Sequence, residues 1–297
     1  MYQNAASPKA RKPPTLTNPS LCKLTKKNRH SQTRQTRSLS LRVILRNSLL
    51  FFVASSVIAV YLFRWLPLPT TTFMLYRHYE DLIDDHSFKP IQYQWVSARN
   101  ISPNASAAVI ASEDQQFYQH FGFDLQAIRS AITAYLNGGR RLRGASTISQ
   151  QVAKNVFLTP SKSFIRKGLE VWFTLLIEII WTKERIVAVY LNIAEFGDHL
   201  FGIEAASQHY FGIPAKNISR PQAAMLAATL PNPLRLKAAR PSSYVLKRQS
   251  WILRQMRNLG DTHNLNGNYS VPLFNKEGLG EILLDKSPSV PLFQRGR

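Results

Sequence analysis

The sequence contains a single cysteine, Cys22, and no acidic residue before Glu80. One cysteine cannot form an intramolecular disulfide, so no disulfide framework stabilises this fold. Acids are scarce throughout, because 17 Asp and Glu stand against 38 Lys and Arg, which gives a formal net charge of +21. Such an excess points to a nucleic acid, an anionic membrane surface or a phosphorylated ligand as the partner.

The cations are concentrated at the N-terminus. Eleven of them lie in the first 46 residues, together with four prolines and no apolar periodicity, which predicts a disordered tail over residues 1–46. The other 27 cations lie beyond residue 46 with all 17 acids, so the body of the protein is basic as well. The tail also lacks the interleaved aromatics or zinc-ligand spacing that would favour nucleic-acid binding, and we therefore expect none.

An uncharged apolar run of 17 residues, 47–63, follows the tail and is closed by Arg64 and Trp65. Its length and flanks predict a transmembrane helix over 47–66 rather than a buried core helix. The cation excess on one side predicts a cytoplasmic N-terminus, with everything after residue 66 exported. No small-x-small cleavage site follows the run, so we expect an anchor that stays attached rather than a removable signal peptide.

Beyond residue 75 the apolar pattern is mainly helical and predicts one domain over 75–260, followed by a polar tail over 261–297. Val109, Glu113 and Phe117 recur at spacing four, which predicts a helix with a carboxylate on its apolar stripe. Residues 137–145 combine three glycines with three arginines and predict a cationic loop.

Several helix boundaries carry local signals. Thr147 with Gln150 predicts a capping box, and Thr182 predicts the start of a later helix. Gly212 fits the left-handed position that ends a helix. A longer helix is expected over 164–181. A last amphipathic helix is expected over 242–259, with its apolar face formed by Leu246, Ile252, Met256 and Leu259.

Two carboxylates, an amide-rich helix start and a group of cations lie close together in this sequence. Taken singly, each has a structural explanation; Arg166 and Glu170, for example, are spaced for an ordinary ion pair on a helix face. Their combination in a chain with a predicted membrane anchor indicates a site for an anionic substrate.

The ordered segments EDQQFYQHFGFD (113–124), GASTISQQVAKN (144–155), RKGLE (166–170) and KERIVAVYLN (183–192), with the later FGIEAASQHYFG and AAMLAATLPNP, resemble the motifs of the peptidoglycan glycosyltransferase family. The resemblance covers residues 107 to 235 and implies a mainly α, lysozyme-like helical domain after a single transmembrane helix. It implies an enzyme of the bacterial inner membrane that polymerises lipid II in cell-wall synthesis, with its catalytic domain in the periplasm.

The resemblance also implies roles for the matched residues. Glu113 is the expected general base, since burial on an apolar stripe would raise the proton affinity of a carboxylate. Glu170 is the second catalytic carboxylate, which orients the cations or assists the leaving group. Lys154 is expected at the diphosphate. The other expected substrate contacts are Asp114, Phe117, His120, Gly144, Ser146, Thr147, Gln150, Gln151, Asn155, Lys162, Arg166 and Lys167. Lys162 stands where the family usually has arginine, which removes a bidentate contact to phosphate.

Within the family, the chain is most similar to members that lack the transpeptidase domain of penicillin-binding proteins. Its only Ser-x-x-Lys, at Ser20 to Lys23, lies in the N-terminal tail, and Lys-Thr-Gly is absent. A lysozyme-type hydrolase and an inactive scaffold that recruits other cell-wall or division proteins are the alternatives. The implied partners are lipid II, the growing glycan strand and the membrane. No cofactor is implied, and dependence on a divalent cation stays open.

Overall fold

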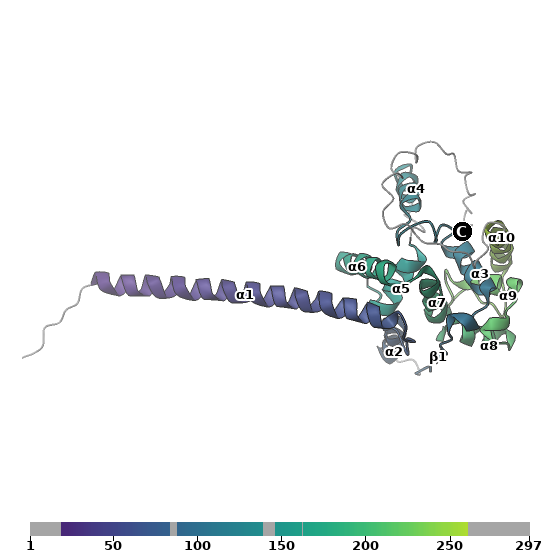
Figure 1. Cartoon of the computed structure of the whole chain (residues 1–297), viewed down its shortest axis with the longest axis horizontal. Coiled ribbons are helices and arrows are strands. Elements are labelled where there is room, and N and C mark those ends of the chain that lie inside the picture. The colour runs from purple at the N-terminus through teal and green to yellow at the C-terminus, as the bar shows by residue number, and fades with distance from the viewer. Residues whose placement is uncertain (1–18, 84–87, 139–145, 162, 261–297) are drawn as a thin grey trace, which may run out of the picture.

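The computed structural model describes residues 19–83, 88–138, 146–161 and 163–260. These form a globular, mainly helical part from which one long helix projects (Figure 1). The helices are α1 (Pro19–Phe63), α2 (Thr72–Ile83), α3 (Pro103–Glu113), α4 (Leu125–Leu136), α5 (Ile148–Phe157), α6 (Phe164–Ile180), α7 (Lys183–Ile193), α8 (Ile203–Phe211), α9 (Arg220–Thr229) and α10 (Ser243–Gly260), with short 3-10 turns at Ala98–Asn100 and Ala215–Asn217. The mainly helical fold with an N-terminal apolar helix is confirmed.

The apolar part of α1 spans Leu41–Phe63, has a mean hydropathy of 2.0 and is long enough to cross a membrane. The helix itself begins at Pro19, inside the segment for which we predicted disorder. Proline is compatible with the first turn of a helix, and no other proline follows before Pro67, so nothing in the backbone interrupts a helix that continues from the apolar segment. Residues 1–18 and 261–297 of the two predicted tails lie outside the described residues.

The C-terminal turns of α1 pack against α6 and the start of α7. The indole nitrogen of Trp172 donates to Ser56 Oγ at 3.1 Å, and that of Trp181 donates to the Val60 carbonyl at 2.7 Å. Arg185 donates to the carbonyl of Phe63 at 2.7 Å. These contacts join the apolar helix to the globular part, so an anchored α1 would hold the globular part beside the bilayer.

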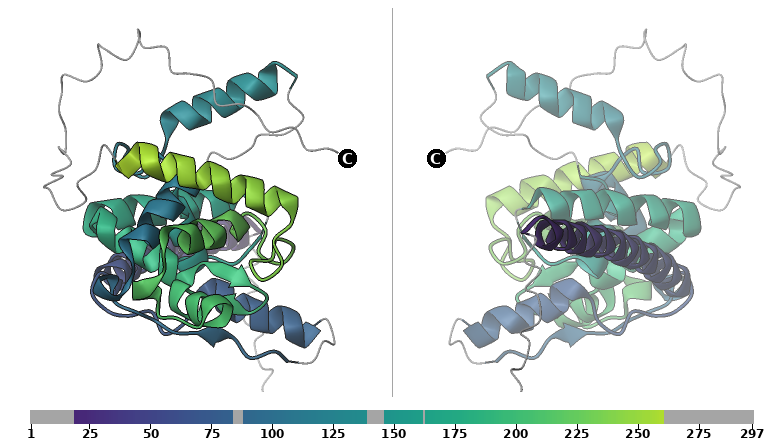
Figure 2. Two further views of the ribbon diagram at one scale, coloured as in Figure 1. Left: turned by 90° about the vertical axis from the view of Figure 1, so that its right-hand side faces the viewer. Right: turned by 90° about the vertical axis from the view of Figure 1, so that its left-hand side faces the viewer.

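The core is centred on α7. All residues of this helix except Glu184 and Arg185 are buried, which is typical of a helix surrounded by other elements. Helix α5 packs against α7 and also against α6, whereas α3 packs against α7 and forms a second group of helices with α9 and α10 (Figure 2). Helix α4 stands apart from this body and buries none of its residues.

A small sheet lies at the edge of the core in the order β1-β3-β2, formed by β1 (Gln92–Tyr93), β2 (Glu195–Gly197) and β3 (Leu200–Phe201). Strand β1 is parallel to β3, whereas β2 pairs with β3 in antiparallel register. The turn between β2 and β3 places His199 at a φ of 58°, in the left-handed region that few residues other than glycine adopt.

The local helix signals are confirmed where they depend on neighbouring residues. Thr147 and Gln150 form the capping box of α5, Thr182 caps α7, and Gly212 ends α8 with a φ of 66°. Two assignments of faces were wrong. Helix α3 ends at Glu113, so Phe117 belongs to the following turns. On α10, Leu246 is 45% exposed because the helix is rotated to bury the adjacent Val245.

Candidate active site

Glu113 is the last residue of α3. Ser102 caps the start of this helix and Pro103 occupies its first position, while a row of buried alanines packs the helix closely against the core. The Glu113 side chain is 16% exposed, so it is accessible from outside. The spacing that suggested an apolar stripe was misleading, because the helix ends before Phe117.

The Glu113 carboxylate is held by neighbours from three helices. Ser112 of α3 donates to Oε1 at 3.1 Å, and Gln151 Nε2 of α5 donates to Oε2 at 3.3 Å. A guanidinium nitrogen of Arg248, on α10, lies 3.5 Å from Oε1 and also donates to Ser112 Oγ at 3.1 Å. Sequence analysis missed Arg248, which lies far along the chain and outside the quoted motifs.

The residues just after Glu113 are turned into the protein. Asp114 Oδ1 pairs with His120 Nε2 at 2.9 Å, and its Oδ2 accepts from the Ile148 backbone N–H at 3.0 Å. Phe117 is fully buried. Asp114, Phe117 and His120 therefore fix the segment behind the proposed base to α5, and Phe117 does not reach the surface where we expected a substrate contact.

The residues of α5 that we expected to contact the substrate fall into two groups, one that caps the helix and one that is accessible. Thr147 and Gln150 are buried and make the capping box, with Thr147 Oγ1 also donating to the Gly122 carbonyl at 2.7 Å. Gln151 and Lys154, three residues apart, lie on one face of the helix and are partly accessible. Ser146 is exposed and Asn155 is half-buried, whereas Gly144 lies outside the described residues.

Glu170 lies under two cations on α6. Arg166 donates to Oε2 at 2.7 Å and Lys167 donates to Oε1 at 2.5 Å. The Glu170 side chain is only 4% exposed, whereas the Lys167 side chain is 48% exposed. The carboxylate is thus buried beneath its two cations, of which Lys167 is the more exposed, since the Arg166 side chain is 21% exposed. Lys162, the position that departs from the family pattern, lies outside the described residues.

Lys154 is electrostatically linked to both carboxylates. Burial lowers the pKa of its ammonium group, and the negative charges of Glu170 and Glu113 partly oppose this effect. Arg166 and Lys167 lower the pKa of Lys154 further, because three like charges share this region. Of the cations that the sequence indicated, Lys154, Arg166 and Lys167 therefore lie near the two carboxylates.

A buried ion pair contacts both α5 and the segment that follows Glu113. Glu178 and Lys183 lie 2.9 Å apart, and Glu178 also accepts a hydrogen bond from Ser149 of α5. Lys183 donates to the His120 carbonyl at 2.8 Å and lies over the Phe117 ring, with its nitrogen 4.4 Å from the ring centre. Sequence analysis missed this pair, although a glutamate within the apolar stretch 171–181 was the signal that could have revealed it.

No group of three or more metal-ligating His, Cys, Asp or Glu side chains occurs within the described residues.

The chain is similar to proteins of known classification. A transglycosylase family model matches residues 81–257. The chain is 50% identical over 216 residues to a biosynthetic peptidoglycan transglycosylase of Pseudomonas putida, covering 73% of this chain and 91% of that protein. Proteins with the same description from Haemophilus influenzae (50% over 210 residues, 71% and 85%) and Chromohalobacter salexigens (52% over 213 residues, 72% and 90%) are similar to it as well.

Proposed function

The chain belongs to the transglycosylase family and is a peptidoglycan glycosyltransferase, and from this premise we propose that it polymerises lipid II into β-1,4-linked glycan strands with release of undecaprenyl diphosphate. The observation that carries the proposal is the hydrogen bond from Gln151 of α5 to the accessible Glu113 carboxylate, because Lys154 lies three residues further along α5 on the same face as Gln151. Such a site supplies a base and a positively charged region in one place.

In the proposed reaction, Glu113 takes the proton from the 4-hydroxyl of the acceptor sugar. The hydroxyl oxygen attacks the anomeric carbon of the donor from the face opposite the diphosphate, so an α-linked donor gives a β-linked product. The bond between the anomeric carbon and the diphosphate oxygen breaks, and both electrons leave with the diphosphate. Gln151 supports this role, because its hydrogen bond to Oε2 orients the Glu113 carboxylate.

The leaving diphosphate gains charge as this bond breaks. Lys154, Arg166 and Lys167 are the cations proposed to stabilise that charge. Both oxygens of Glu170 are engaged by Arg166 and Lys167, which favours a role in orienting these cations over direct proton donation.

The proposed setting is the bacterial inner membrane, with α1 crossing once, the N-terminus in the cytoplasm and the site in the periplasm. The span at Leu41–Phe63 and the cations before it support this orientation. In intact cells Cys22 should then resist membrane-impermeant thiol reagents, whereas a cysteine introduced at Ser250 should react. Labelling of Cys22 before lysis would contradict this orientation. The growing strand and other cell-wall proteins are the proposed partners.

The decisive experiment gives the detergent-purified full-length protein lipid II and measures polymer and released lipid diphosphate. Glu113→Gln keeps the size of the side chain but cannot accept the proton, so polymerisation should fall by a factor of order 10² to 10⁴ while the variant remains folded. Glu184→Gln, at an exposed glutamate of α7, is the matched control. Full polymerisation by a folded Glu113→Gln variant would refute the base, and soluble fragments from finished peptidoglycan would favour a hydrolase.

A further inference from the structure

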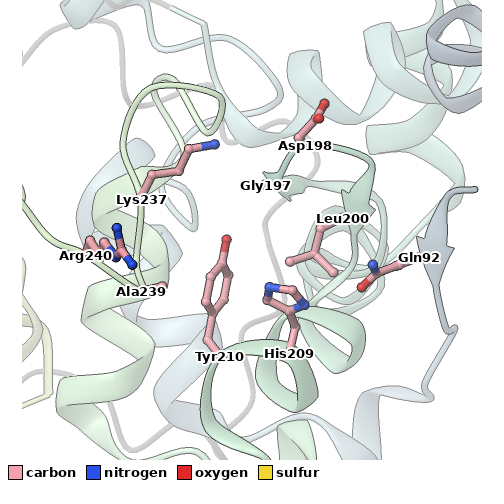
Figure 3. Close-up of a pocket in the computed structure, with 9 residues that line it drawn as sticks. All are labelled: Gln92, Gly197, Asp198, Leu200, His209, Tyr210, Lys237, Ala239 and Arg240. Carbon is pink, nitrogen blue, oxygen red and sulfur yellow. The ribbon is translucent and has the colours of Figure 1, made fainter. Parts of the chain in front are cut away.

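A separate cavity of about 290 Å³ lies beside the small sheet and shares no residue with the candidate active site. It opens between the β2–β3 turn, the end of α8 and the segment that joins α9 to α10 (Figure 3). Its walls include Gln92, Asp198, His209, Tyr210, Lys237 and Arg240.

The position of Tyr210 in the wall of this cavity is fixed by its contacts with Phe196 and Gly197. Tyr210 donates its hydroxyl proton to the Phe196 carbonyl at 3.1 Å. A Cβ atom at Gly197 would lie 2.8 Å from the Tyr210 hydroxyl oxygen, so only glycine permits this approach. The Tyr210 hydroxyl has no further proton to give and can only accept a hydrogen bond from a ligand. Burial raises the pKa of Tyr210, which keeps this hydroxyl protonated.

The charge of the cavity is positive on one side. Lys237 and Arg240 are exposed, and neither has an ion pair within the described part of the chain. Among the described residues that line the cavity, Asp198 alone is a carboxylate, and it pairs with Lys89 at 2.8 Å and Arg77 at 3.3 Å. An anion that enters the cavity therefore meets two available cations and little repulsion.

We propose that this cavity binds the carboxylate end of a short peptide, and specifically of the peptides that peptidoglycan carries. Arg240 and Lys237 match the carboxylate, and the Tyr210 hydroxyl, as an acceptor, matches the neighbouring peptide N–H. A phosphate offers no such N–H. The cavity is at the small end of ligand pockets, which suits a few peptide atoms rather than a protein surface. The source of the peptide rests on the proposed function, whereas the carboxylate chemistry does not.

The test uses the full-length protein in detergent and ligand-observed saturation-transfer NMR. The probe is acetyl-alanyl-alanine with a free carboxylate, compared with its carboxamide and with inorganic phosphate. The free acid should bind saturably, with the carboxamide at least ~10-fold weaker because the charged contacts are lost. The double variant Lys237→Gln/Arg240→Gln should also bind the acid at least ~10-fold more weakly.

Arg235→Gln is the matched control, since Arg235 is an exposed cation of the same segment that does not line the cavity. It should bind the acid as the wild type does. Gly197→Ala should weaken binding as well, because the added methyl group displaces Tyr210. Equal binding of acid and amide, wild-type binding by the double variant, or phosphate that binds as tightly as the peptide would each overturn the proposal.

The source of the peptide is tested with soluble glycan fragments that carry peptides and with the same fragments after the peptides have been removed. Only the first should compete with the dipeptide; competition by neither would remove peptidoglycan as the source. The Arg235→Gln control should polymerise lipid II at the wild-type rate. Absence of polymerisation by the wild type would instead contradict the proposed function and leave the peptide measurement intact.

Discussion

Gln151 Nε2 lies 3.3 Å from Oε2 of Glu113, so a side chain of α5 holds one oxygen of a carboxylate at the end of α3. The other oxygen lies 3.5 Å from Arg248 of α10. The proposed base is thus oriented by two helices to which it is not covalently adjacent.

Replacing Gln151 with methionine tests this orientation. The variant keeps the length of the side chain and removes the amide donor, so kcat should fall by roughly 10- to 100-fold, while KM for lipid II changes little, because the base is displaced but the cations remain. Gln208→Met, at an exposed position of α8, is the control. An unchanged kcat with a folded Gln151→Met variant would show that the contact plays no part in catalysis.

Lys154 should govern the alkaline limb of the pH profile. Burial lowers the pKa of its ammonium group, so its charge is present below that pKa and is lost as the pH rises through it, earlier than for an ordinary lysine. The kcat for polymerisation should therefore decline with rising pH. Lys154→Arg, whose guanidinium keeps its charge, should move this decline to higher pH.

Lys154→Met provides the companion measurement. It should lower turnover by a factor of order 10² and lipid II binding much less, since the charge on the leaving group develops only as the bond breaks. An alkaline limb that stays in place in Lys154→Arg, or turnover that is unchanged in Lys154→Met, would remove this lysine from the chemistry.

The buried ion pair of Glu178 and Lys183 should affect the free energy of unfolding. Lys183→Met leaves a buried carboxylate without its cation, which should cost about 3–5 kcal/mol of unfolding free energy. The double variant Glu178→Met/Lys183→Met removes both charges and should recover part of that loss. Denaturant unfolding of the detergent-solubilised protein measures both. A double variant that is less stable than Lys183→Met would show that the charges do not compensate one another.

The parts of the structure that sequence analysis predicted correctly depend on neighbouring residues. Thr147 and Gln150 satisfy the first turn of α5 within four residues, and Gly212 supplies a local backbone conformation, so both are visible in a short window. The contacts of Arg248 with Glu113 and of Lys183 with His120 join distant segments, and no periodicity reveals them. These distant contacts decide which residues face the substrate.

The dependence on contacts between distant segments also explains why the buried faces of α3 and α10 were predicted wrongly. Spacing four through Glu113 and Phe117 fits a continuous helix, yet α3 ends at Glu113 because the Asp114 carboxylate is drawn to the start of α5. On α10, the choice between Val245 and Leu246 depends on how the helix packs against α3 and α9, which the amphipathic pattern leaves ambiguous by one residue.

Glu170 provides the test that separates orientation from proton transfer. Its two oxygens accept from Arg166 at 2.7 Å and Lys167 at 2.5 Å, so Glu170→Gln removes the charge that holds both cations. We expect kcat to fall by a factor of order 10 to 10² while both limbs of the pH profile remain. The alkaline limb should move to lower pH, because the charge of Glu170 no longer raises the pKa of Lys154. Loss of one limb would instead identify Glu170 as a proton donor.

A double-variant cycle with Arg166→Gln makes this distinction quantitative. If Glu170 acts by holding Arg166, the two substitutions remove the same arrangement, and the double variant should lose little more activity than the worse of the two single variants. If Glu170 transfers a proton, its effect is independent of Arg166 and the two losses should multiply. Polymerisation rates of the four proteins at one lipid II concentration well above KM, with Glu184→Gln as the control, decide between these outcomes.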